Sequence, residues 1–191
     1  MLQHLQKYNI ILGSNSPRRK ELLNGLDIDF KVITNNIDES YPSNIANLDI
    51  PRYLAEKKAN SYLLTNEDLL ITADTIVWLD NTVYGKPTDR TDAKKMLKAL
   101  SGRKHQVITG VCIRTLRQTK IFHAITDVYF NPLSDSQIGY YLDNYKPYDK
   151  AGSYGVQEWI GYVAVERIDG SYFNVMGLPI HQLYHELLEW K

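Results

Sequence analysis

Alternating apolar and polar stretches divide the first part of the chain into short predicted elements. Residues 10–12 are apolar and lead into a small polar turn from Gly13 to Ser16, after which leucines recur at helical spacing from Pro17 onward. Ser16 and Pro17 suit the N-cap and the first position of a helix. The pattern predicts a strand, a tight polar turn and a helix.

The longest apolar run covers residues 69–79 and predicts a strand buried on both faces. Other elements follow from the same periodicities. They are strands at residues 30–33 and 83–84, a helix beginning at Pro51 and carried on to residue 63, and a helix at residues 89–100 capped near Thr91 and Asp92.

The second half of the chain begins with two long strand patterns, at residues 105–116 and 120–130, around a turn at Arg117 and Gln118. Two such runs joined by a short turn are typical of an antiparallel hairpin. The remaining predictions are a helix at 133–142, a loop at 144–157, a strand at 162–168 and a helix at 179–190.

These elements favour an α/β fold with one mixed, elongated and twisted sheet flanked by helices. The second half of the sheet is expected to be largely antiparallel. Repeats and low-complexity linkers are missing from the sequence, so a single domain over residues 1–191 is expected.

Composition narrows the classes of partner. Lysine plus arginine and aspartate plus glutamate both number 22, so no overall field favours nucleic acid or an anionic membrane. The only cysteine, Cys112, lies in an apolar stretch and is expected to be an inert core thiol. Without a signal-peptide pattern or a membrane-length apolar run, the chain is expected to be cytoplasmic.

The turn after the first strand is a candidate anion site. Ser14 and Ser16 supply hydroxyl groups, and the start of the following helix supplies free N–H groups. Arg18 and Arg19 stand in the first helical turn, where the helix dipole disfavours cations unless an anion is bound in front of it. A triphosphate would satisfy this arrangement; the alternative is an ordinary turn with two solvated arginines.

Two acidic residues are candidates for a divalent cation. Asp74 interrupts the buried apolar strand, and an ionised carboxylate there needs a cation or a metal. It could hold Mg²⁺ or activate water, or it could instead cap a neighbouring turn. Glu39, in a polar loop, is either a second oxygen ligand or a surface acid.

Lys57 and Lys86 complete the candidate set. Most lysines are solvated, but Lys86 is held between Gly85 and Pro87, which presents its ammonium group on a rigid segment. Together these residues describe a nucleotide phosphate site, in which catalysis depends on positioning and on neutralising phosphate charge. The sequence contains neither a P-loop nor a dinucleotide-binding pattern.

Eight blocks occur in an order that makes the chain similar to one known family. They are SNSPRR, DES, AEKKA, ADTIV, GKP, SGRKHQVITGV, DKAGSYGVQ and GSYFNVMGLP. The chain closely resembles the Maf family of nucleoside triphosphate pyrophosphatases from Ile10 to about Leu188.

The resemblance implies a Maf/ITPase-like fold and hydrolysis of a nucleoside triphosphate to the monophosphate and pyrophosphate, with Mg²⁺ or Mn²⁺. It implies that Asp74 is the proton acceptor, and that Ser14, Ser16, Arg19, Glu39, Lys57 and Lys86 handle phosphate and metal, with Glu39 and Asp74 as metal ligands. Substrate selection is implied at Arg18, Thr75 and Gln157.

The block DKAGSYGVQ resembles the branch that acts on dTTP and UTP. The amide of Gln157 can both donate to and accept from the edge of uracil or thymine, although it could also flip to suit cytosine. Modified pyrimidine triphosphates are further expected substrates. A homodimer is one possible oligomeric state.

Two other classes of function remain as alternatives. One is a nucleotide-sensing regulator of cell division or septum formation, a role attached to the family's name. The complete set of Asp74, Glu39, Lys57 and Lys86 favours the enzyme, since a sensor needs no base and metal ligands. An RNA-binding module is disfavoured by the zero net charge, so no stable nucleic-acid partner is expected.

Overall fold

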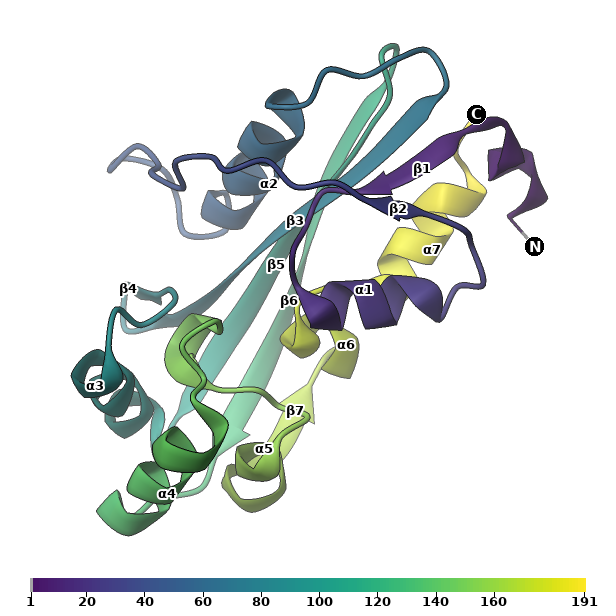
Figure 1. The fold of residues 1–191 in the computed structure, drawn as a ribbon. Helices are drawn as coiled ribbons and strands as arrows, with labels where there is room; N and C mark the ends of the chain where they lie inside the picture. Colours follow the sequence, from purple (N-terminus) through teal and green to yellow (C-terminus); the bar gives the residue numbers. More distant parts are fainter. Residues whose placement is uncertain (1) are drawn as a thin grey trace. The chain divides into compact units, whose positions relative to one another are not determined.

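The computed structural model describes residues 2–191, and the strands of this part of the chain form one mixed sheet of seven (Figure 1). The strands are β1 Asn9–Leu12, β2 Lys31–Val32, β3 Asp68–Leu79, β4 Thr82–Tyr84, β5 Lys104–Arg114, β6 Thr119–Phe130 and β7 Val165–Asp169. They are ordered β2-β1-β3-β5-β6-β7, and β4 pairs with β3 outside this path.

The direction of pairing changes along the sheet as the sequence predicts. β1 is parallel to both β2 and β3, with Ile11 opposite Lys31 and Leu70. β3 and β4 are antiparallel, as are β6 and β7. The short turn in which Thr115 N–H donates to the carbonyl of Gln118 joins β5 to β6 as the expected hairpin.

The chain forms two compact units. The first comprises the described residues up to Asp74, with Thr109–Ala124 and Gly177–Lys191, and the second comprises Thr75–Ile108 and Ile125–Met176. Because β3, β5 and β6 each have residues in both units, neither unit is a continuous segment. One domain over residues 1–191 stays a prediction.

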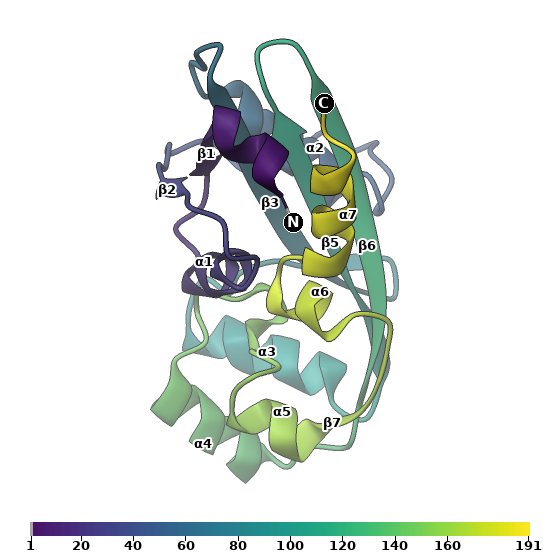
Figure 2. The same ribbon diagram turned by 90° about the vertical axis from the view of Figure 1, so that its right-hand side faces the viewer.

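The helices of the first unit are η1 Gln3–Lys7, α1 Pro17–Asn24, α2 Ile50–Asn60 and α7 Ile180–Leu188. Figures 1 and 2 place α2 and α7 on opposite faces of this unit's part of the sheet. The expected helix starts at Pro17 and near Pro51 are confirmed, and Ser16 caps α1 by accepting from the N–H of Arg19.

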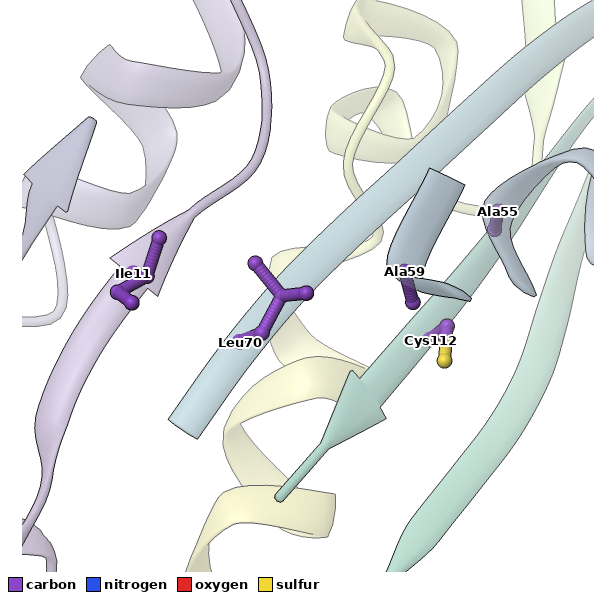
Figure 3. Close-up of a cluster of buried hydrophobic side chains, with 5 residues drawn as sticks. All are labelled: Ile11, Ala55, Ala59, Leu70 and Cys112. Atoms are coloured by element: carbon purple, nitrogen blue, oxygen red, sulfur yellow. The ribbon is translucent and has the colours of Figure 1, made fainter. Parts of the chain in front are cut away.

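A compact apolar cluster joins α2 to the sheet. Figure 3 shows Ile11, Leu70 and Cys112 from three neighbouring strands with Ala55 and Ala59 of α2. The small alanine side chains allow a close approach of helix and sheet. The thiol is fully buried, and this burial raises the pKa of Cys112 to about 12, so the predicted core position of this cysteine is confirmed.

One glycine allows α2 to approach the sheet closely. A Cβ atom at Gly110 of β5 would lie 2.3 Å from the carbonyl carbon of Pro51, in the first turn of α2. Only a residue without a side chain fits there. The start of α2 is therefore fixed against β5 by backbone contact.

The helices of the second unit are α3 Arg90–Leu100, α4 Asp135–Tyr145, η2 Ala151–Ser153, α5 Trp159–Ala164 and α6 Tyr172–Met176. Lys94 and Lys98 of α3 both pair with Asp135 at the start of α4, at 3.2 and 2.8 Å. The cap of α3 is Asp89, which accepts from the N–H of Asp92; the predicted cap at Thr91 and Asp92 is wrong, because these residues already lie within the first turn.

The strand predicted at residues 162–168 is also partly wrong, since residues 159–164 form helix α5 and only Val165 onward is strand. The aromatic and β-branched residues of this stretch favour a strand locally. Ile160 and Ala164, four residues apart, are both fully buried on one face of the helix. Burial in the tertiary structure thus overrides local propensity. Across the described residues, the helices are too short or too polar to cross a membrane.

A buried histidine lies among aromatic side chains of the second unit. His105 of β5 lies 2.8 Å from the hydroxyl of Tyr154 through Nε2, and its ring packs edge-on against Phe130 and Tyr154. Burial disfavours the charged imidazolium and lowers the pKa of His105 to about 4. The folded unit therefore holds this histidine in its neutral form.

This pKa predicts a pH-dependent stability. Between about pH 4 and about pH 6.5 the unfolded chain binds a proton at His105 that the folded chain does not, so the free energy of unfolding falls as pH falls through this window. We expect a loss of up to about 2 kcal/mol between pH 7 and pH 5 from this group. Urea unfolding at both pH values measures it, and the His105→Gln variant should lose this part of the pH dependence. An unchanged dependence in the variant would contradict the assignment.

Candidate active site

The chain turns between β1 and α1 (Figure 1), and its own serines hold this polar turn. Ser14 Oγ accepts from the N–H of Ser16 at 3.2 Å, and Ser16 Oγ accepts from the N–H of Arg19 at 3.4 Å. At the start of the turn, a Cβ atom at Gly13 would lie 2.8 Å from Thr72 Cγ2 and 2.9 Å from the hydroxyl of Tyr62. The turn is thus pressed closely against β3 and the end of α2.

Arg19 is fixed beside this turn by backbone carbonyl groups. Its Nε donates to the carbonyl of Gly177 at 2.8 Å, and its Nη1 donates to the carbonyl of Ala73 at 2.8 Å and to Ser14 Oγ at 3.3 Å. Burial lowers the pKa of Arg19, and the nearby carboxylates of Asp74 and Glu39 oppose this effect. A guanidinium group always carries its charge, so the site holds a fixed, partly desolvated cation.

Asp74 lies on β3 directly after Ala73 and is almost completely buried. Its carboxylate accepts from Lys58 Nζ of α2 at 2.6 Å. Two residues earlier on the same face of β3, Thr72 Oγ1 donates to the carbonyl of Ala55 at 2.7 Å. Ala55 and Lys58 are three residues apart and share one side of α2, so the register between helix and strand delivers the ammonium group to Asp74.

The same ammonium group reaches a second acid. Lys58 Nζ lies 2.8 Å from Glu39 Oε1, and the Lys58 side chain is only 15% exposed. Lys57, the lysine expected from the sequence, extends to another place: its Nζ donates to the carbonyl of Ser40 at 2.8 Å and lies 3.5 Å from Asp38. Asp74, Glu39 and Lys58 therefore form one charged cluster, with Lys57 at its margin.

The loop that carries Glu39 is tied to the end of α2. The hydroxyl of Tyr62 donates to the carbonyl of Ile33 at 2.9 Å and accepts from the N–H of Asn35 at 3.2 Å. The amide of Asn35 donates to the carbonyl of Ser61 at 2.9 Å. These bonds fix the chain shortly before Glu39, and Tyr62 also contacts the Gly13 turn.

The second unit holds three of the candidate residues, Thr75, Lys86 and Gln157. Thr75 is half-buried on β3, and Lys86 is exposed in the segment that follows β4. The carbonyl of Gly85 accepts from the N–H of Gly152 at 3.0 Å, and Gly152 has a φ of +66° and no room for a side chain beside Val77. The rigid presentation of Lys86 expected from its neighbours thus has a tertiary support.

The loop before Gln157 is held by a buried charged network. Lys150 Nζ lies 2.7 Å from Asp149 and 3.0 Å from Glu158, and the hydroxyl of Tyr141 donates to Glu158. Tyr141 also accepts from the N–H of Gly155 at 3.0 Å. Burial and the Glu158 carboxylate together raise the pKa of Tyr141, so this phenol stays a hydrogen-bond donor.

Two side-chain oxygens of this loop are buried without a hydrogen-bond partner. Within residues 2–191, Gln157 Oε1 and Ser153 Oγ are buried and have no hydrogen-bond partner. Ser153 is fully buried and has a φ of +60°, which is uncommon for a residue with a side chain. Other buried atoms of the described residues lack partners too, and two of them within five residues make this loop a candidate place for a ligand to supply the partner.

The sequence model described as "Maf-like protein" matches residues 9–190. The chain belongs to the Maf family. The resemblance inferred from the eight sequence blocks is therefore confirmed.

Curated relatives extend this finding. The chain is 57% identical over 190 residues to a dTTP/UTP pyrophosphatase of Parabacteroides distasonis, with 98% of each chain covered. It is likewise 57% identical over 190 residues to the protein of the same name from Bacteroides fragilis, again with 98% of each covered. A dTTP/UTP pyrophosphatase of Porphyromonas gingivalis is 54% identical over 195 residues, covering 100% of this chain and 98% of its own.

Solved structures of more distant proteins share the fold. The Staphylococcus aureus Ham1 protein has a TM-score of 0.50 at 15% identity, covering 93% of this chain and 99% of its own. A HAM1 protein from Coxiella burnetii has a TM-score of 0.51 at 17% identity, covering 96% and 100%. The expectation of an α/β sheet of this type is confirmed.

For this member of the Maf family, the structure adds Lys58 to the charged cluster and Ser153 to the loop before Gln157, and the sequence singled out neither. The pair of adjacent lysines in AEKKA offered two candidates, and only the register of α2 against β3 distinguishes them. Ser153 carried no recognisable signal, since its backbone conformation and burial are tertiary properties. Tyr62 was assigned only to the predicted helix, and its contacts with two loops come from folding.

Proposed function

We propose that this chain hydrolyses dTTP and UTP, and modified pyrimidine triphosphates, between the α and β phosphates. The observation that carries the proposal is the cluster in which a buried carboxylate, Asp74, shares the ammonium group of Lys58 with Glu39. A water-activating base and fixed cations are what hydrolysis of a phosphoanhydride requires. Relatives at 57% identity over nearly the whole chain bear the name dTTP/UTP pyrophosphatase.

In this proposal Asp74 accepts the proton of the attacking water. Its position on β3, with helix α2 packed over it, keeps the carboxylate fixed and largely removed from solvent. As the water oxygen bonds to the α phosphorus, the bond to the bridging oxygen breaks and pyrophosphate leaves. Lys58 balances the two acids in the free chain, so that neither carboxylate is buried without a cation.

The polar turn binds the triphosphate. Arg19, with its guanidinium oriented by the carbonyls of Gly177 and Ala73, supplies charge, and Ser14 and Ser16 supply hydroxyl groups. The start of α1 adds N–H groups that favour an anion. Lys86 is proposed to neutralise further phosphate charge from its rigid segment.

Glu39 and Asp74 fit a divalent cation. Both offer hard carboxylate oxygens, and the two already converge on one cationic atom, Lys58 Nζ, at 2.8 and 2.6 Å. When bound, Mg²⁺ or Mn²⁺ would neutralise charge on the phosphate oxygens. Among the described residues, no group of three potential metal ligands is present, so these two acids are the proposed protein ligands. Mg²⁺ usually keeps several waters and binds substrate phosphate oxygens, which would fill its other coordination positions.

Gln157 is proposed to read the edge of the base, with Arg18 and Thr75 as the other selecting residues. The unpaired oxygen of Gln157 supports this role, because an N3–H of uracil or thymine would satisfy it. The alternative function as a regulator of cell division has no observation in its favour. A nucleotide pool substrate is consistent with a cytoplasmic enzyme, and a homodimer remains a prediction.

The products test the function directly. We expect UTP and dTTP to give the monophosphate and pyrophosphate without orthophosphate, and activity to be lost with a chelator and restored by Mg²⁺ or Mn²⁺. Ion-exchange chromatography of the products, without added pyrophosphatase, makes the measurement. Diphosphate and orthophosphate would place the attack at the γ phosphorus and refute the proposal.

The two adjacent lysines provide a matched pair of variants. We expect Lys58→Gln to lower kcat by about 10²-fold or more, because an amide cannot hold Asp74 and Glu39 by charge. Lys57→Gln should stay within a few-fold of the parent chain, since Lys57 contacts Ser40 and Asp38 at the margin. Steady-state kinetics with UTP measures both, with circular dichroism as the control for folding. The reverse ranking would contradict the assignment of Lys58.

The substrate selectivity of a Gln157 variant tests whether this residue reads the base. The Gln157→Ala variant should lower kcat/KM for UTP and dTTP by about ten- to a hundredfold, because an unmatched buried group costs about 1–3 kcal/mol. Nucleotides that the parent chain hydrolyses poorly should lose much less. Measuring kcat/KM for UTP, dTTP, CTP and GTP separates base reading from loop bracing, since a uniform drop across all four nucleotides would show bracing alone.

A further inference from the structure

Two histidines form an exposed pair on helix α7, on the first unit. His181 and His185 are four residues apart and lie on one face of the helix, with Nε2 atoms 3.3 Å apart and ring centroids 4.6 Å apart. Both residues are exposed. The proposed hydrolysis uses neither of them.

The helix that carries the pair is firmly held. Leu183 and Leu187, on the opposite side of α7, are fully buried, and Trp190 just beyond the helix is buried as well. The imidazole of His4 lies 2.9 Å from the carbonyl of Leu187, and Lys120 pairs with Glu186 at 3.2 Å. The two histidines are therefore presented by a helix that is packed against the rest of the first unit.

The spacing of the two nitrogens matches a chelate. An imidazole nitrogen binds Zn²⁺ at about 2.0–2.1 Å, so two such ligands at a tetrahedral angle lie about 3.3–3.4 Å apart. The observed separation of 3.3 Å matches this nitrogen–nitrogen distance. Because both rings are exposed, each Nδ1–H can face solvent while Nε2 carries the metal bond.

We propose that His181 and His185 bind one late first-row divalent cation of the Zn²⁺ class. Imidazole is a preferred ligand of Zn²⁺, Ni²⁺ and Cu²⁺, whereas Mg²⁺ prefers the oxygens supplied by Glu39 and Asp74. The described part of the chain brings no third histidine, cysteine or acid to the pair, so water occupies the other coordination positions. The site differs in chemistry and in residues from the proposed catalytic centre.

The alternative is that one ring simply donates a hydrogen bond to the other, since a neutral imidazole has one donor and one acceptor nitrogen. A hydrogen-bonded pair needs only one ring protonated at Nε2. A chelating pair needs both Nε2 atoms unprotonated and available to the ion. Direct measurement of metal binding distinguishes the two.

Isothermal titration with ZnCl₂, in excess Mg²⁺ to occupy the carboxylate oxygens, tests the proposal. We expect one equivalent of Zn²⁺ per chain, and an affinity for that equivalent reduced by about tenfold or more in His181→Asn and in His185→Asn, since losing even an outer-shell partner of a ligand costs about 10–100-fold. The matched control is His123→Asn, a half-buried histidine on β6 outside the pair, which should bind as the parent chain does.

The results separate this site from the proposed hydrolase activity. Hydrolysis of UTP with Mg²⁺ should be unchanged in His181→Asn and His185→Asn, because α7 carries no residue assigned to the reaction. Absence of Zn²⁺ binding, or binding that is equal in the parent chain and both variants, would refute the site and leave a hydrogen-bonded pair. Because the readout is metal binding, failure of the proposed function would leave this test intact.

Discussion

The buried ion pair between Asp74 and Lys58 is the constraint on which the arrangement of the first unit depends. A carboxylate on an apolar strand is stable only beside a cation, and breaking such a pair by removing one partner costs several kcal/mol. The cation reaches Asp74 because α2 packs on the sheet through alanines, through the Thr72 hydroxyl and through contact at Gly110. The packing of α2 on the sheet therefore also determines whether the charge of Asp74 is balanced.

Arg19 is a second buried charge that the fold holds in position, beside Ala73 of β3. Burial and the neighbouring Arg18 lower the pKa of Arg19, whereas the carboxylates of Asp74 and Glu39 raise it, and two backbone carbonyls hold the guanidinium group in position. A chain with equal numbers of acidic and basic residues has no overall field to attract a nucleotide. Attraction of a triphosphate must then come from such local cations, held in position before the substrate arrives.

The second unit holds in place a loop that contains buried polar atoms without hydrogen-bond partners. The network of Lys150, Glu158 and Tyr141 and the ring cluster around His105 fix the chain on either side of Ser153 and Gln157. Leaving buried oxygens without partners destabilises the free protein. The surrounding contacts stabilise the loop enough to offset this destabilisation, as is common where a rigid scaffold supports a binding loop.

The sequence by itself determined the order and type of most elements, because strand and helix periodicities and caps such as Ser16 are local. It also determined the family, through eight ordered blocks, and with the family most of the candidate residues. The tertiary structure decided what local rules cannot reach: residues 162–164 became helical because Ile160 and Ala164 are buried together. It also chose between Lys57 and Lys58, because successive residues of a helix point about 100° apart and only the packing of α2 against β3 shows which of them faces Asp74.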